Sequence, residues 1–280
     1  MSNYDIFKTQ WENIAEKIIG SYDCLCLQIN LTKLYNLPII KQNLSFELEK
    51  FNIYGVNTRI KDISKTWLHE HLVNLGLSTL KAHQIGDPNE LLFIKTDLNY
   101  GGYIEKTIEE HGYSKKALID SPINNSYGPY SYCIARRDEL RAEIWSNESI
   151  VIEKFVDNSL DSFFRVYFSG QQVVIVKAHS KALVKKLEGD ERDINYLTNL
   201  NELISNSGEI PLDRNLLWLI AHFLKCTPVE FGCIDIVYDD QKNYFIVDLN
   251  ITPFGGKTPP NEEICLYLSL GILEPKLRRN

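Results

Sequence analysis

The stretch EFGCIDIVYDDQKNYFIVDLNITPFGGK, residues 230–257, contains two short apolar runs separated by a polar turn and followed by a glycine-bearing exit. Asp235 lies on the first run, and Asp248 and Asn250 lie on the second. Since side chains two residues apart on a strand share a face, the latter two point the same way. With a four-residue turn at 240–243, Asp235 falls opposite Asp248. The stretch therefore predicts a β-hairpin in which two carboxylates meet across the strands.

The same register pairs Asp239 with Tyr244 and predicts an apolar surface on the other side of the hairpin. An unbroken apolar surface of this kind is typical of strands that pack on a core. The side chains predicted to form it are Ile234, Ile236, Tyr238, Phe245, Val247 and Leu249.

Two interpretations of the facing carboxylates are open. Like charges directly opposite each other destabilise a hairpin, and partly buried carboxylates need compensation. A divalent cation would supply that compensation, and oxygen donors without a neighbouring histidine suit Mg²⁺ or Mn²⁺ better than Zn²⁺. The alternative is a solvated hairpin whose acids face water, because acidic turns are common.

The composition of the chain is that of a globular protein. Its 280 residues are 44% hydrophobic and 24% charged, and this length permits one large or two modest domains. The formal net charge of −7 argues against a nucleic-acid backbone as the main partner. The sequence leaves the oligomeric state open, including a homodimer.

The cysteines and the chain start bear on the compartment. The six cysteines form no C-x-x-C pair and no Cys/His cluster with zinc spacing, so we expect reduced thiols in a cytoplasmic protein. The first 20 residues combine acids with amphipathic spacing, which does not match a signal peptide. No run approaches the ~18 apolar residues of a membrane span, so we expect no membrane partner.

Helices and strands are mixed along the whole chain, which predicts an α+β or α/β protein. Apolar periodicity and turn signals mark their bounds. Polar residues 182–211 are interpreted as a loop or ragged helix. Helices are predicted at 4–19, 62–76, 136–145, 214–226 and 262–273, and strands at 24–29, 53–59, 91–96, 116–120, 130–135, 149–157, 161–170 and 171–181.

Five residues outside the hairpin are candidates for a chemical role, and each of them has more than one interpretation. A strand that ends near Lys95 leads into a loop with Gly101 and Gly102, where backbone N–H groups could approach a phosphate, although a plain turn is the alternative. Arg165 lies inside an apolar run and needs an anionic partner, either a structural acid or a ligand phosphate. Lys65 starts a predicted helix, where a solvated lysine is the default.

The succession of these signals, rather than any one of them, resembles the ATP-grasp superfamily. This superfamily includes D-alanine ligases, glutathione synthetases, ribosomal-protein glutamate ligases and inositol phosphate kinases, and the resemblance covers about residues 60–270. It implies an α+β fold in which two lobes grip a nucleotide beside a small N-terminal α/β domain. The implied domains are 1–60, a central lobe at 61–152 with the glycine loop, and a C-terminal lobe at 153–280 with the metal site.

The resemblance also implies a nucleotide site. The run 153–156 resembles the hinge that binds adenine, Asp161 is placed to take the ribose hydroxyls, and the paired glycines would cover the phosphates. Two lysines would reach those phosphates. The residues assigned to ATP in this way are Lys65, Lys95, Gly101, Gly102, Glu153, Lys154, Phe155, Val156 and Asp161.

Catalytic and metal-binding roles follow from the same resemblance. Arg165 would lie near the transferred phosphoryl group together with Lys95, and Lys177 on the next strand would assist it. Asp235, Asp248 and Asn250 would hold Mg²⁺ or Mn²⁺; these three are the predicted metal ligands. Many of the ligases have Glu in place of the second aspartate.

The leading hypothesis is an ATP-dependent ligase that converts a small-molecule or peptide carboxylate into an acyl phosphate, which an amine then attacks to give an amide. A second hypothesis is a kinase of the inositol phosphate type, which would phosphorylate a hydroxyl. A third is an ATP-binding module without catalysis.

Overall fold

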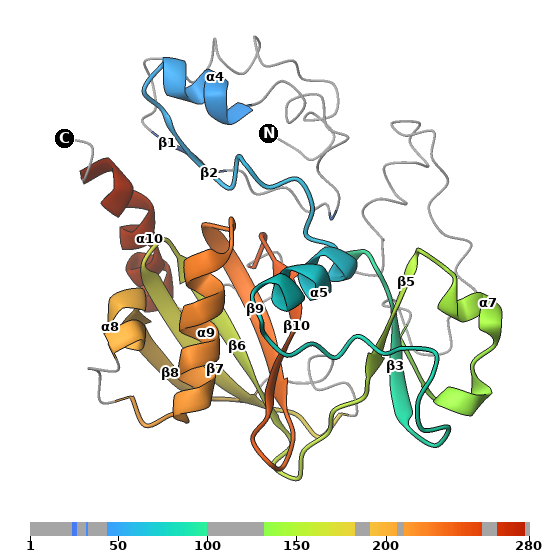
Figure 1. The fold of residues 1–280 in the computed structure, drawn as a ribbon. Helices are drawn as coiled ribbons and strands as arrows, with labels where there is room; N and C mark the ends of the chain where they lie inside the picture. The colour runs from blue at the N-terminus through green and yellow to red at the C-terminus, as the bar shows by residue number, and fades with distance from the viewer. Residues whose placement is uncertain are drawn as a thin grey trace.

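The computed structural model of this chain has an α+β fold, as the mixed pattern of helices and strands predicts, and its described strands form three separate sheets (Figure 1). No helix among its described residues has the length and hydropathy that a bilayer crossing requires. The structure describes residues 24–26, 32, 44–99, 132–182, 191–205, 210–253 and 262–277.

The N-terminal unit is a pair of parallel strands with one helix. β1 (Cys24–Cys26) pairs with β2 (Tyr54–Val56), so both strands predicted here are present in shortened form. α4 (Leu44–Lys50) was not predicted, and it buries Leu48 completely in the main core. The helix predicted at 4–19 lies outside the described residues.

A three-stranded antiparallel sheet forms the middle of the chain, in the order β4-β3-β5. Its apolar side packs Leu92, Ile94 and Ile152 against a short helix. The elements are β3 (Leu91–Thr96), β4 (Cys133–Arg136), β5 (Ile150–Lys154) and the helix α7 (Ala142–Trp145).

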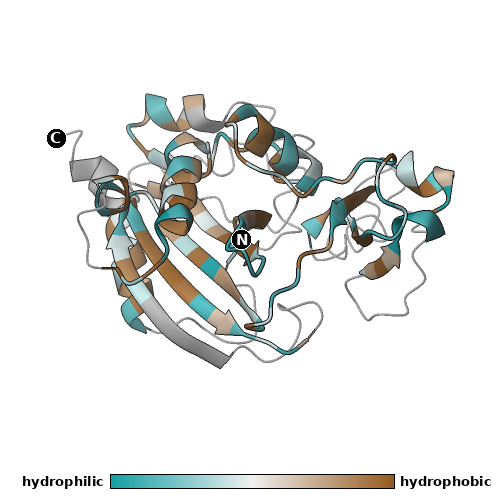
Figure 2. Cartoon of the chain, turned by 60° about the horizontal axis from the view of Figure 1, so that its bottom comes forward, coloured by the Kyte–Doolittle hydropathy of each residue, from teal (hydrophilic) through white to brown (hydrophobic). Residues whose placement is uncertain are grey.

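A five-stranded antiparallel sheet follows, in the order β10-β9-β6-β7-β8. Figure 2 shows apolar residues recurring along its strands, as expected for strands covered by helices. The β6–β7 hairpin turns at Gly170, as the serine-glycine turn predicts. The strands are β6 (Ser162–Ser169), β7 (Gln172–His179), β8 (Glu191–Asn199), β9 (Phe231–Tyr238) and β10 (Tyr244–Asn250).

Helices cover both faces of this sheet. α8 (Leu200–Ser205) and α9 (Arg214–Cys226) lie on one face, and α10 (Glu262–Leu277) packs on the other. α9 begins at Asp213, whose side chain accepts a hydrogen bond from the Asn215 backbone. Its buried stripe has helical spacing and consists of Leu216, Leu217, Leu219, Ile220, Ala221 and Phe223.

α5 (Lys65–Asn74) lies between the two larger sheets (Figure 1) and positions the site described below. Ser64 caps its first turn by accepting a hydrogen bond from the Trp67 backbone. Gly76 follows its last turn with a φ of 70°, the conformation that favours glycine after a helix. These two signals are the reason why the predicted helix is present at this position.

Two predictions of secondary structure are wrong. Residues 136–145 do not form one helix, because the backbone becomes extended at Leu140 and Arg141 between a 3₁₀ turn and α7. The polar region 182–211, interpreted as a loop or ragged helix, contains β8 and α8. β8 is an edge strand, and edge strands need little apolar periodicity because one side receives no neighbour.

We predict that Gly271→Ala destabilises the fold, because it disturbs the close packing of α10 against β6. A Cβ atom at this position would lie 1.7 Å from the Ser169 carbonyl oxygen, so the helix would have to shift away from β6. Overpacking of this kind costs about 1–3 kcal/mol or more. Urea unfolding should show that loss, whereas the exposed control Ser269→Ala should leave the free energy of unfolding unchanged within about 0.5 kcal/mol.

Candidate functional site

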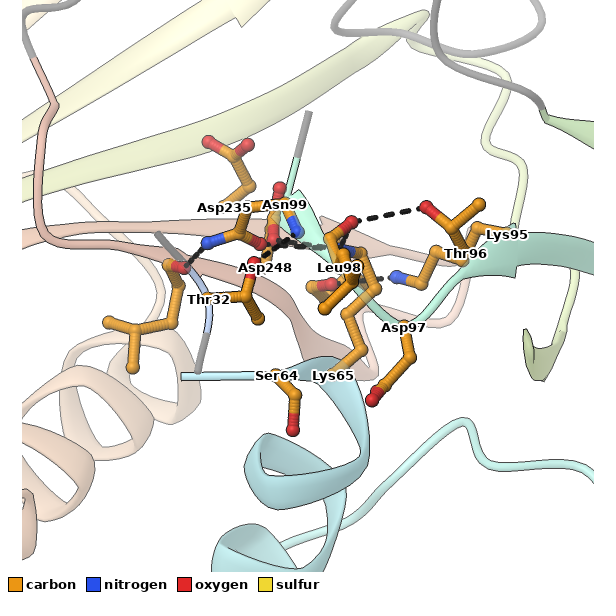
Figure 3. A network of polar contacts seen from close by, with 12 residues as sticks. Thr32, Ser64, Lys65, Lys95, Thr96, Asp97, Leu98, Asn99, Asp235 and Asp248 are labelled. Atoms are coloured by element: carbon orange, nitrogen blue, oxygen red, sulfur yellow. Dashed lines mark hydrogen bonds and ion pairs between the residues drawn. The ribbon is translucent and has the colours of Figure 1, made fainter. Parts of the chain in front are cut away.

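Polar side chains from both larger sheets gather where the end of β3 and the start of α5 meet the β9–β10 hairpin (Figure 3). The predicted facing of two carboxylates is confirmed, because Asp248 pairs with Asp235 across the hairpin. The turn differs from the prediction, since Tyr244 pairs with Tyr238. The register therefore shifts by one residue along the hairpin.

The shift is caused by a β-bulge at Val247. Ile246 before it pairs with Ile236, and Asp248 after it pairs with Asp235. Ile246 and Leu249 are each 1% exposed and lie in the main core. The prediction that Phe245 and Val247 belong to the apolar core face is therefore wrong, because the bulge places Ile246 there. Bulges re-aim backbone and side-chain groups in this way and occur often beside functional sites.

Lys95 on β3 binds the bulge directly. Its Nζ lies 2.8 Å from the carbonyl oxygen of Val247 and 2.7 Å from Oε1 of Glu153 on the neighbouring strand β5. The lysine is 3% exposed. One buried ammonium group thus connects the three-stranded sheet to the hairpin of the five-stranded sheet.

Glu153 is at the centre of a buried cluster with Lys95 and His69. Nε2 of His69 lies 2.8 Å from the same Oε1, and both the glutamate and the histidine are almost completely buried. Burial acts to raise the pKa of the Glu153 carboxyl, but the charge of Lys95 and the hydrogen bond with His69 together hold this pKa below its ordinary value. The carboxylate is therefore ionised and belongs to the protein's own ion pair.

Lys65, in the first turn of α5, points to the hairpin acids. Its Nζ donates hydrogen bonds to the Leu98 carbonyl oxygen at 3.0 Å and to Oδ1 of Asn99 at 3.2 Å, and it lies 4.0 Å from Oδ1 of Asp248. At 3% exposure it is not the solvated lysine that is the default for its position. Asn99 in turn donates to the Leu249 carbonyl oxygen at 3.2 Å.

Arg165 and Asp235 occupy paired positions on β6 and β9. Nε donates to Oδ1 at 2.8 Å and Nη2 donates to Oδ2 at 3.3 Å, so the guanidinium holds both carboxylate oxygens. The charge of Asp235 raises the pKa of Arg165 although burial opposes this. Of the two partners considered for Arg165, the structure shows the acid. This ion pair also compensates one of the two facing carboxylates.

The oxygen donors of the hairpin fit one Mg²⁺ or Mn²⁺ ion. Asp248 offers a carboxylate that is 18% exposed, and Asn250 lies on the same face. Oδ1 of Asn250 already accepts hydrogen bonds from the backbone N–H and the hydroxyl of Thr252, at 2.8 and 2.9 Å. Within the described parts of the chain, no group of three or more His, Cys, Asp or Glu side chains could hold a metal. Water molecules or ligand phosphates would therefore fill the remaining positions around the ion.

Asp235 is a less favourable ligand for a divalent cation than Asp248, because its carboxylate already binds Arg165. A guanidinium and a divalent cation about 5 Å apart repel each other by about 7 kcal/mol at an effective dielectric constant of 20. The carboxylate would therefore hold a metal ion less tightly while the guanidinium is bound to it.

The hinge residues are placed at the end of β5. Lys154 is exposed and lies 3.3 Å from Glu90, and the Phe155 backbone N–H donates to the Leu91 carbonyl oxygen. Among the described residues, the backbone N–H of Val156 has no acceptor, which leaves it available to a ligand. Asp161 directly precedes β6 and lies in the left-handed region, at a φ of 47°. Such strain is found preferentially at functional sites.

The structure does not bring every predicted residue to this place. Lys177 pairs with Phe164, one position away from Arg165, so it lies on the opposite face of the sheet and cannot assist the arginine. Gly101 and Gly102 lie outside the described residues.

Three residues of the site were missed from the sequence: Thr32, His69 and Asn99. The hydroxyl of Thr32 accepts a hydrogen bond from the Asn99 backbone at 2.8 Å, and both residues are buried. The sequence places His69 next to Leu68 on a helix, and nothing in this local pattern identifies the partner of its ring. Only the folded structure shows that its ring contacts the carboxylate of Glu153 on β5.

We predict that Glu153→Gln destabilises the protein by about 3 kcal/mol or more, because it leaves Lys95 buried without its counter-charge. The double variant Lys95→Met with Glu153→Gln should recover part of this loss. Urea unfolding of the four proteins in this cycle measures the coupling. Equal, additive losses would contradict the ion pair.

The same cluster predicts a pH dependence. The lowered pKa of Glu153 means that its ionised form stabilises the fold above the ordinary value of 4.5, and that this contribution is lost as the pH falls through the lowered value. The difference in unfolding free energy between the wild type and Glu153→Gln should therefore be constant near neutrality and shrink in acid. A difference that grew in acid would contradict the assignment.

Comparison with known proteins yields structures but no sequence relatives. No family model matches the chain, and no curated protein matches it. The ATP-grasp ligase PsnB, solved with a phosphomimetic variant of its minimal precursor, Mg and ADP, is 11% identical with a TM-score of 0.44 over 81% of this chain. The chain spans 65% of that ligase.

Two further solved structures of similar fold come from bacteria. Biotin carboxylase from Campylobacter jejuni is 13% identical with a TM-score of 0.47, over 94% of this chain and 56% of its own. L-amino acid ligase from Bacillus licheniformis is 14% identical with a TM-score of 0.39, over 76% of this chain and 46% of its own.

Proposed function

We propose that this protein is an Mg²⁺- or Mn²⁺-dependent ligase that uses ATP to activate a carboxylate as an acyl phosphate and joins it to an amine. The observation that carries this proposal is the convergence at the hairpin. Three cations from different elements converge there: Lys65 lies 4.0 Å from Asp248, Arg165 binds Asp235, and Lys95 binds the carbonyl oxygen of the bulge next to Asp248. Buried groups of both signs, preorganised at one point, suit a reaction in which phosphate charge moves.

The nucleotide would lie with its adenine at the hinge and its phosphates at the hairpin. The backbone N–H of Val156, which has no acceptor among the described residues, would donate to the adenine ring, and Asp161 would receive the ribose hydroxyls. Gly101 and Gly102 would cover the phosphates. Glu153 would contribute through its backbone and through Lys95, because its carboxylate is engaged in the buried cluster.

A divalent cation at Asp248 and Asn250, with Asp235 opposite, would neutralise charge on the phosphates. Lys65 keeps Asp248 in place through a 4.0 Å ion pair, and Lys95 fixes the bulge that aims it. Arg165 would stabilise the phosphoryl group as a substrate carboxylate oxygen attacks it. An amine would then displace phosphate from the acyl phosphate, which requires no covalent enzyme intermediate.

The substrates would be a small-molecule or peptide carboxylate and an amine, in the cytoplasm. The small N-terminal domain at 1–60 would help to hold one of them, with the lobes at 61–152 and 153–280 gripping ATP. Lys177 has no place in this proposal because of its position on the other face of the sheet.

ADP release is the direct test. The protein is incubated with ATP, Mg²⁺ and a panel of amino acids, peptides and small carboxylates, and the products are identified by mass. We expect an amide, with ADP formed only when a carboxylate and an amine are both present. A phosphorylated alcohol would instead identify a kinase, and ATP binding without turnover a silent module.

We predict that Asp248→Asn lowers turnover of the responsive substrate pair by about 100-fold or more, because an electrostatic contribution made in the transition state is lost. The folded state should persist, with the melting temperature within a few degrees of wild type. The exposed acid Asp138 provides a matched control, since Asp138→Asn should keep full activity. Turnover that survives Asp248→Asn would refute the role of this carboxylate.

A further inference from the structure

We propose that Arg165 and the divalent cation compete for Asp235, so that metal binding expels the guanidinium from this carboxylate and frees it to turn toward the phosphates. Arg165 is then a built-in counter-cation of the site before ATP arrives, as well as a group that acts on the phosphoryl transfer. This inference rests on the proposed function and adds to it an order of events at one carboxylate.

The geometry puts the two cations in competition for one carboxylate. Arg165 and Asp235 are directly paired on neighbouring strands, and two N–H groups of the arginine take both carboxylate oxygens. The side chain of Asp235 is only 9% exposed, so little of its surface is open to another ligand. A metal ion that bound the remaining lone pairs would lie within a few ångströms of a positive charge in a poorly screened place.

Asp248 is more accessible than Asp235, and this difference sets the order in which a metal ion would bind the two carboxylates. Asp248 is twice as exposed as Asp235, and its nearest described cation, Lys65, lies at 4.0 Å rather than at 2.8 Å. Lys65 is also held by two other oxygens, the Leu98 carbonyl and Oδ1 of Asn99. A metal ion would therefore meet Asp248 first and take Asp235 only when Arg165 leaves.

The side chain of Arg165 can rotate away from Asp235 while its backbone stays paired in the sheet. Its side chain is 22% exposed, and the centre of its guanidinium lies 5.7 Å from the Phe163 ring on the same face of β6. Rotation of the side chain about its own bonds moves the guanidinium away from the carboxylate while the backbone pairing with β9 stays intact. The aromatic ring offers a partial replacement for the lost partner.

The first test is the affinity for Mn²⁺ without nucleotide, measured by electron paramagnetic resonance of the free ion. Arg165→Met should bind Mn²⁺ at least 10-fold more tightly than the wild type, because a second carboxylate becomes available. The double variant Arg165→Met with Asp235→Asn should lose this gain, and the exposed control Arg136→Met should bind as the wild type does. An Arg165→Met protein with unchanged or weaker affinity would overturn the competition.

Because Arg165→Met leaves a buried carboxylate without its partner, a second measurement uses the wild-type protein. In a nitrogen-15 NMR spectrum of arginine side chains, the Nε–H signal that Arg165→Lys removes belongs to Arg165. We expect this signal to move as Mg²⁺ is added without nucleotide, with the same half-saturation as metal binding. A signal that stays fixed while the metal binds would overturn the proposal.

Neither measurement depends on turnover. A protein that shows the competition but forms no amide with any substrate would retain this inference and lose the proposed ligase function. A protein that forms an amide while the Nε–H signal ignores the metal would keep the function and lose the inference.

Discussion

The contact between Lys95 and the Val247 carbonyl oxygen connects the two larger sheets, and the rest of the site depends on it. A buried ammonium needs a counter-charge, which Glu153 supplies from the next strand, and the glutamate in turn binds His69 of α5. α5 then presents Lys65 to Asp248. Four elements distant in sequence are thereby fixed relative to one another by a chain of charged groups with low exposure to solvent.

The acids of the hairpin illustrate how a sheet can hold like charges close together. Asp235 and Asp248 face each other, yet each has a cationic neighbour from a different element. Arg165 makes a bidentate contact on one side, whereas Lys65 stands further from its acid. Charge balance is therefore nearly complete before any ligand binds, and a polyanionic ligand has to bring its own cation or displace one of these groups.

The sequence predicts the local features well, because they follow from short-range rules. The facing of Asp235 and Asp248 is an example, since alternation along two strands suffices to infer it. The bulge at Val247 escapes such reasoning, because an extra residue in one strand leaves no mark in an apolar run. The arginine partner of Asp235 escapes it as well. That pairing joins positions 70 residues apart, and only the order of strands in the sheet brings them together.

The Val247 bulge has a consequence for how this site would vary among related proteins. Lys95 binds the backbone of this residue and not its side chain, which is only half-buried. Many residue types at position 247 would present the same oxygen, so an alignment of relatives would show a freely varying column at one of the site's principal contacts. The length of the strand, by contrast, would be invariant. Loss of the extra residue would leave Asp248 opposite Asp235 in a regular hairpin but remove the carbonyl oxygen that Lys95 binds, so selection at this point would act on chain length rather than on chemistry.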